Sequence, residues 1–141
     1  MKFLAARART LERGRAAMIL VDTSVWIDHF RSSNRQLVQL LEANLVSVHP
    51  WVVGELACGN LADRANVFSL LNAMPQLPVA SEAEALFFIE RNSLAGKGIG
   101  YIDVHLLAAA TLGSARLWTL DKRLLAAAEG LGLAYRPADP S

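Results

Sequence analysis

The stretch that decides the fold is "MILVDTSVWIDHFR", residues 18–31. It opens with a short apolar run, typical of a buried β-strand, and the run ends in the carboxylate of Asp22. Thr23 and Ser24 follow at once, and either can cap the helix that is predicted to begin there. A strand that passes directly into a helix is the first half of a strand–helix–strand unit.

The same alternation of strand and helix continues along the chain. Further strands are predicted at 45–49, 77–80, 115–120 and 133–136. Further helices are predicted at 34–43, 50–61, 62–74, 81–95, 101–112 and 122–132. This order predicts an α/β domain, a parallel sheet with helices on both faces. Ligands of such sheets bind beyond the carboxyl ends of the strands.

The composition is that of one globular domain. The chain has 141 residues, of which 53% are hydrophobic and 19% are charged, so it can bury a core and is not disordered. No apolar run approaches the roughly 20 residues that span a bilayer. Cys58 is the single cysteine, which excludes an internal disulfide and suits a reducing compartment. We therefore expect a soluble, cytoplasmic protein with no membrane partner.

The net charge of +1 hides an asymmetry. Residues 1–17 carry five basic side chains and one acidic one, whereas the rest of the chain carries nine basic and twelve acidic ones. The body therefore does not have the charge of a protein that coats nucleic acid. We divide the chain into a basic extension, 1–17, and a domain, 18–141. The extension is interpreted as an upstream start or a loose helix in preference to a basic arm for phosphates.

Four carboxylates are predicted to meet at one edge of the sheet. Asp22 closes the first strand and Asp121 follows the strand at 115–120, so both lie where parallel strands end. Glu55 and Asp103 lie on helices that follow a strand or a loop on the same side.

These carboxylates have apolar neighbours. Glu55 stands in "WVVGELACG" (51–59), and an ionised carboxylate buried in such a run is costly unless it is paired. No Lys or Arg stands at a matching spacing to pair with each acid. A hard divalent cation, which takes oxygen ligands, resolves this difficulty. Taken singly, Asp22 and Asp121 are also compatible with helix capping, and Asp103 with a helix dipole.

Four segments carry a resemblance to a known family: "ILVDTSVWID", "VVGELACG", "GIGYIDVHLLAAA" and "LWTLDKRL". They resemble the acidic motifs of PIN-domain ribonucleases, and are most similar to the VapC toxins of bacterial toxin–antitoxin pairs. The likeness runs from Met18 to about Arg136. It implies a three-layer α/β/α fold. It also implies a quartet that binds Mg²⁺ or Mn²⁺, with two supporting hydroxyls: Asp22, Glu55, Asp103 and Asp121, supported by Ser24 and Thr119.

The resemblance further implies an activity and its partners. The activity is metal-assisted hydrolysis of RNA phosphodiester bonds by an endoribonuclease, leaving a 5′-phosphate and a 3′-hydroxyl. The partners are the RNA substrate, a cognate antitoxin and a second copy in a homodimer, with helices 34–43 and 62–74 as candidate docking surfaces. Candidate cations for the RNA backbone, for each of which a solvated surface charge is the preferred interpretation, are Arg31, Arg91, Lys97 and Lys122.

Three other functions fit the sequence less well. A phosphoacceptor signalling domain also binds Mg²⁺ at strand ends, but it leaves Glu55 and Asp103 without a role. A DNA-structure nuclease requires a DNA-clamping region, and a purely regulatory PIN domain does not require all four acids. Cys58 is predicted to be buried, and His105 to face away from the carboxylates. The three tryptophans are predicted to lie in the core.

Overall fold

The computed structural model describes residues 17–138, so the predicted extension lies outside the described residues except for Ala17. The strands are β1 (Ile19–Val21), β2 (Val46–Ser47) and β3 (Arg116–Trp118). The helices are α2 (Thr23–Ser32), α3 (Arg35–Glu42), α4 (Pro50–Ala57), α5 (Arg64–Ala73), α6 (Glu82–Arg91), α7 (Tyr101–Leu112) and α8 (Lys122–Gly130). None of these helices is long and apolar enough to cross a membrane.

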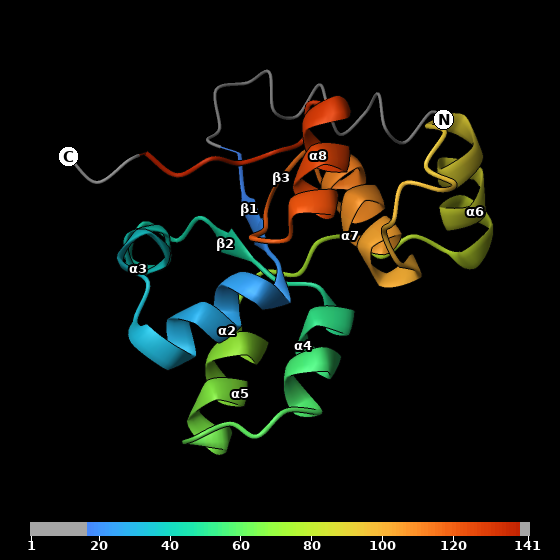
Figure 1. Ribbon diagram of the computed structural model, residues 1–141. Helices are drawn as coiled ribbons and strands as arrows, with labels where there is room; N and C mark the ends of the chain where they lie inside the picture. Colours follow the sequence, from blue (N-terminus) through green and yellow to red (C-terminus); the bar gives the residue numbers. More distant parts are fainter. Residues whose placement is uncertain (1–16, 139–141) are drawn as a thin grey trace.

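The strands form one parallel sheet in the order β2-β1-β3. In its register, Ile19 of β1 pairs with Val46 on one side and with Arg116 on the other. Figure 1 shows α6, α7 and α8 together on one side of the molecule, and α2, α4 and α5 beyond the end of β1. The predicted α/β fold with a parallel sheet is confirmed.

The predicted strands at 77–80 and 133–136 are wrong. A single parallel bridge forms just before the first segment, between Gln76 and Val48, and a single one forms within the second, between Ala134 and Leu117. Helix α4 begins at Pro50, two residues after Val48, so no strand continues there for this segment to pair with. At the other edge, β3 ends at Trp118, so the last segment finds little strand to pair with.

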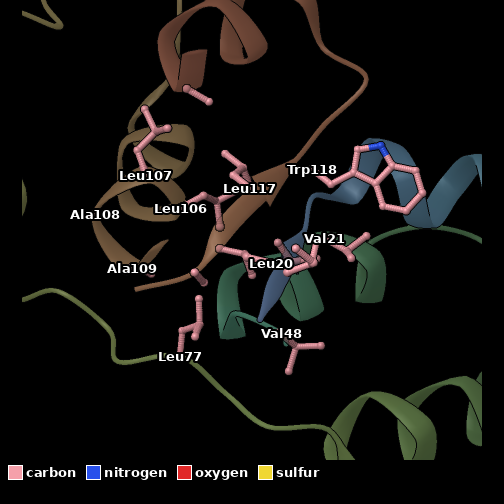
Figure 2. Packing of buried hydrophobic residues seen from close by; sticks show 14 of the residues in the cluster. Leu20, Val21, Val48, Leu77, Leu106, Leu107, Ala108, Ala109, Leu117 and Trp118 are labelled. Carbon is pink, nitrogen blue, oxygen red and sulfur yellow. The ribbon is translucent and has the colours of Figure 1, made fainter. Parts of the chain in front are cut away.

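The core lies around β1 and α7. All three residues of β1 are buried, and so are eight of the twelve residues of α7. Figure 2 shows Leu106 and Leu107 of α7 beside Leu20 and Leu117 of the sheet. A helix that is apolar over most of its circumference is stable only when it is buried. Asp103 lies in the first turn of α7, so it is carried by a helix that the core holds in place.

Two predicted helix boundaries are wrong for a local reason. Helix α4 ends at Ala57 rather than at residue 61, and α5 begins at Arg64 rather than at residue 62. Asp63 has a φ of 55°, a left-handed conformation that no helix interior contains. The Arg64 guanidinium donates to the Ala57 carbonyl at 2.7 Å and to the Gly59 carbonyl at 3.2 Å. These bonds satisfy carbonyls that the end of α4 leaves free.

The C-terminal ends of α6 and α8 also fall short of the prediction. Helix α6 ends at Arg91 rather than at residue 95, and α8 ends at Gly130 rather than at residue 132. Ser93 has a φ of 53° and Gly132 a φ of 71°, so neither residue can continue a right-handed helix. The predicted capping box at the start of α6 is confirmed, because Ser81 and Glu84 exchange hydrogen bonds of 2.8 and 3.1 Å.

Burial of α7 predicts a large stability difference between two leucines. Leu107 is fully buried, and Leu107→Ala is expected to lower the free energy of unfolding by about 2–5 kcal/mol through lost contacts and a cavity. Leu120, which follows β3, is 51% exposed, and Leu120→Ala is expected to change it by at most about 0.5 kcal/mol. Urea denaturation measures both. Equal effects would contradict the described core.

Candidate active site

Asp22 is the most constrained of the predicted acids. It follows β1 and is only 7% exposed. Although it occupies the N-cap position of α2, its side chain makes no capping hydrogen bond in the described part of the chain. Instead, its Oδ2 accepts hydrogen bonds from Ser24 Oγ and from Thr119 Oγ1, each at 2.7 Å. Helix capping therefore does not explain this side chain.

The two hydroxyls are themselves held by backbone. Ser24 Oγ accepts the Leu120 N–H at 3.0 Å, and Thr119 Oγ1 accepts the Asp121 N–H at 3.1 Å. Both hydroxyl protons are committed to Asp22, so the 3.3 Å contact between the two hydroxyl oxygens carries no proton. Figure 1 shows α2 and α8 starting where β1 and β3 end. The network thus ties these two strand ends together.

The charges of Asp22 and Asp121 affect the ionisation of Asp103. It is half-buried in the first turn of α7, and its Oδ2 accepts the Gly100 N–H at 3.0 Å. Burial is the largest cause that raises the pKa of Asp103 above its ordinary value, and the charges of Asp22 and Asp121 raise it further. The Gly100 hydrogen bond acts in the opposite direction. The fold therefore brings these three aspartates into one electrostatic cluster.

Asp121 is exposed and does cap a helix. Its Oδ1 accepts the Leu124 N–H at 2.9 Å at the start of α8. This bond engages one oxygen only, as in the other two aspartates. The second oxygen of Asp22, Asp103 and Asp121 accepts no hydrogen bond from residues 17–138. Capping and ligand binding are therefore compatible in Asp121.

Glu55 departs from the prediction, because its side chain is exposed rather than buried. Val52 and Leu56 are the residues of α4 that reach the core, so Glu55 lies on the outer side of the helix. Its Oε1 accepts the Thr23 Oγ1 hydrogen bond at 2.9 Å, which links it to the neighbour of Asp22. Sequence reasoning treated Thr23 only as a helix cap. Its position directly after Asp22 was the signal that it faces the same edge.

Helix α4 carries Glu55, and a histidine caps its N-terminus. His49 is fully buried, and its Nδ1 accepts the Trp51 N–H at 3.1 Å, ahead of Pro50. Burial, with a contribution from the charge of His105, lowers the pKa of His49 to about 4. His49 is therefore neutral near pH 7, as an acceptor nitrogen requires. Sequence reasoning missed this cap because histidine is not among the usual capping residues.

The remaining predictions on single residues have mixed outcomes. Cys58 is exposed, so its predicted burial is wrong; α4 ends before it, and the chain turns outward. Trp26 and Trp118 are buried as predicted, whereas Trp51 is only partly buried, with its ring centroid 4.0 Å from that of His105. His105 is itself buried. The four candidate cations are all exposed: Arg31, Arg91, Lys97 and Lys122.

The carboxylate oxygens of the aspartates are suitable ligands for a hard cation, but the side chains lie too far apart to share one. No three His, Cys, Asp or Glu side chains of residues 17–138 stand close enough to hold a metal ion together. The donors are all carboxylate oxygens, and each aspartate keeps one oxygen free, which is the chemistry that Mg²⁺ and Mn²⁺ prefer. Like charges repel when nothing neutralises them. The aspartates must therefore approach one another further to coordinate an ion.

A family model and two curated relatives each match most of this chain. Residues 19–130 match the family model described as PIN domain. Two curated relatives, both named Ribonuclease VapC32 and from two strains of Mycobacterium tuberculosis, are 47% identical over 118 residues, which is 83% of this chain and 95% of theirs.

Two crystal structures share the fold. PAE2754 from Pyrobaculum aerophilum has a TM-score of 0.58 and 15% identity, covering 81% of this chain and 87% of that one. FitAcB from Neisseria gonorrhoeae has a TM-score of 0.56 and 23% identity, covering 79% and 94%. At such identities the likeness concerns the fold alone.

The raised pKa of Asp103 predicts an unusual response to mutation. A raised pKa means that the ionised carboxyl opposes folding, so without metal the stability of the protein falls as pH rises above the ordinary value of 3.8. Asp103→Asn removes the charge but keeps an acceptor for Gly100. In EDTA at neutral pH its melting temperature is expected to exceed that of the wild type by a few degrees, and the difference is expected to shrink near pH 4.

Thermal melts with and without Mn²⁺ measure this effect. Added Mn²⁺ is expected to stabilise the wild type more than Asp103→Asn. Glu90→Gln, which neutralises an exposed acid on α6, serves as the matched control and is expected to melt like the wild type. A variant less stable than the wild type in EDTA would contradict the electrostatic cluster.

Proposed function

Because the chain belongs to the PIN-domain family, we propose that it is a cytoplasmic, metal-dependent endoribonuclease, the toxin of a toxin–antitoxin pair. The observation that carries this proposal is the buried Asp22 carboxylate at the end of β1, which the Ser24 and Thr119 hydroxyls hold in a fixed orientation. The 47% identity to a protein named a ribonuclease supports RNA as the substrate.

Three aspartates would hold the ion: Asp22, Asp103 and Asp121. When bound, Mg²⁺ or Mn²⁺ acts as a Lewis acid that lowers the pKa of a bound water and neutralises charge on the phosphate. Ser24 and Thr119 fix the orientation of Asp22 through its Oδ2 and leave Oδ1 directed to other partners. Thr23 fixes Glu55 beside this set, at the margin where it completes the proposed quartet.

The hydroxyl network also argues against the phosphoacceptor alternative. Such a domain uses paired acids after its first strand and an isolated lysine after its last core strand. Here Thr23 and Ser24 follow Asp22, and their hydroxyls orient Glu55 and Asp22. After β3 stands Thr119, whose hydroxyl is committed to Asp22. The position that a phosphoacceptor domain gives to a cation is occupied by a carboxylate-orienting group.

The proposal includes two protein partners, an antitoxin and a second copy of this chain. A cavity of about 310 Å³ between α3 and α5, lined mostly by apolar residues such as Leu41, Leu70 and Met74, offers a site for an antitoxin helix. Leu86 and Phe87 of α6 are 52% and 51% exposed, and they offer an apolar surface for a second copy in a homodimer.

Cleavage of total bacterial RNA tests the proposed activity without knowledge of the natural substrate. New RNA ends bearing a 5′-phosphate are mapped by ligation and sequencing after incubation with Mg²⁺. Ser24→Ala is expected to slow cleavage by about 10–100-fold, as for other losses of a group that orients a metal ligand. Asp22→Asn is expected to slow it more, and EDTA to abolish it.

Glu90→Gln is the matched control and is expected to cleave like the wild type. Cleavage that persists in EDTA, or that Asp22→Asn leaves unchanged, would contradict the proposed mechanism. Cleavage by none of the proteins would contradict the proposed activity on RNA.

A further inference from the structure

A second site lies directly beside the carboxylates. A cavity of about 480 Å³ runs along α8, from Lys122, the residue after Asp121, to Gly130. Three cations line it, Lys97 from the loop that precedes α7 and Lys122 and Arg123 from α8. The rest of the lining is mainly apolar, with Leu94 and Leu131 among its residues. No acid of the described residues lines this cavity, which we name the basic cavity.

The cations of the basic cavity have no carboxylate partner within residues 17–138. The ion pair found in this part of the chain joins Arg136 to Glu129 at 2.8 Å. Within residues 17–138, therefore, no carboxylate compensates the charges of Lys97, Lys122 and Arg123. Cations gathered in a cleft raise the local positive potential and attract anions. The basic cavity is therefore chemically suited to an anionic ligand.

The loop that carries Lys97 is shaped to lie against α8. Gly96 and Gly98 have φ values of 75° and 78°, conformations that favour glycine. A Cβ at Gly98 would stand 2.7 Å from Arg123 Cδ and 2.8 Å from Arg123 Nη1. The backbone of the loop therefore lies in contact with the Arg123 side chain, and a side chain at residue 98 would displace it.

The basic cavity and the carboxylate cluster share two segments of chain. Lys122 is covalently next to Asp121. The loop that carries Lys97 ends at Gly100, whose N–H holds the Asp103 carboxylate. The two sites are therefore linked through neighbouring residues of the chain, and a ligand held at the aspartates would have these cations as its near neighbours.

We propose that the basic cavity binds a phosphate of the RNA strand adjacent to the phosphodiester that is hydrolysed. This inference rests on the proposed ribonuclease activity. An RNA strand carries a charge at every nucleotide, so a strand with one phosphate at the aspartates presents the next phosphates to neighbouring surface. Lys122 and Arg123 neutralise such a phosphate, while the apolar lining contacts the sugar or the base. An acidic protein segment is the competing ligand, and RNA is favoured because of the shared segments.

Salt-dependent RNA binding tests this site. Electrostatic binding to the RNA backbone does not depend on sequence, so the unknown substrate is no obstacle. The probe is a fluorescein-labelled oligouridylate, titrated by anisotropy over a range of KCl concentrations with Ca²⁺ in place of Mg²⁺, and its integrity is verified on a gel. The proteins are the full-length wild type, Lys97→Ala, Lys122→Ala and Arg123→Ala.

Each substitution in the basic cavity is expected to weaken binding at low salt. It is also expected to reduce the slope of log K against log[salt] by about 0.7, the value for one lost phosphate contact on single strands. Arg35→Ala, which removes an exposed cation on α3, is the matched control and is expected to keep the wild-type slope. Thermal melts verify that each variant is folded.

Wild-type slopes in all three variants would overturn the basic cavity as an RNA site and would assign its cations to another anion, such as an acidic protein. A wild type that binds no RNA at low salt would overturn it as well. Neither result decides the ribonuclease activity, which the cleavage of total RNA tests separately.

Discussion

The architecture of the site depends on two hydrogen bonds into one carboxylate oxygen. Ser24 and Thr119 both donate to Asp22 Oδ2 at 2.7 Å, and they come from the two sides of the parallel pair β1 and β3. Backbone N–H groups after β3 fix the hydroxyls in turn. A hydrogen bond to a charged group is stronger than one between neutral groups. This network thus converts the meeting of two strand ends into a fixed orientation of Asp22.

The rest of the site is organised by charge. Burial raises the pKa of Asp103 most, and the charges of Asp22 and Asp121 raise it further, so ionised Asp103 is disfavoured in the metal-free protein. The ionised carboxyl opposes folding, and a cation relieves this cost. The cations that line the basic cavity stand one and two residues beyond Asp121 and on the loop before α7. Acidic and basic groups therefore occupy neighbouring positions in the chain, a distribution suited to a metal ion followed by a phosphate chain.

Sequence patterns were informative where burial decides the structure. The apolar run before Asp22 predicted β1, and the nearly all-apolar segment after the glycine-rich loop predicted α7. Sequence patterns failed where a few contacts between residues determine the local structure. Glu55 was interpreted as a buried charge because its neighbours are apolar, but α4 exposes that side and ends before Cys58. The His49 cap and the single-bridge pairing at Gln76 depend on tertiary packing, which periodicity does not encode. The catalytic roles of the four acids stay predictions.

The central claim is that the aspartate cluster is a metal site, and a calorimetric Mn²⁺ titration tests it most directly. The purified, partner-free wild type is expected to bind Mn²⁺, and Asp103→Asn is expected to bind it much more weakly, because one of three oxygen donors loses its charge. No binding by the wild type up to millimolar Mn²⁺, or equal binding by both proteins, would contradict a metal site at these aspartates.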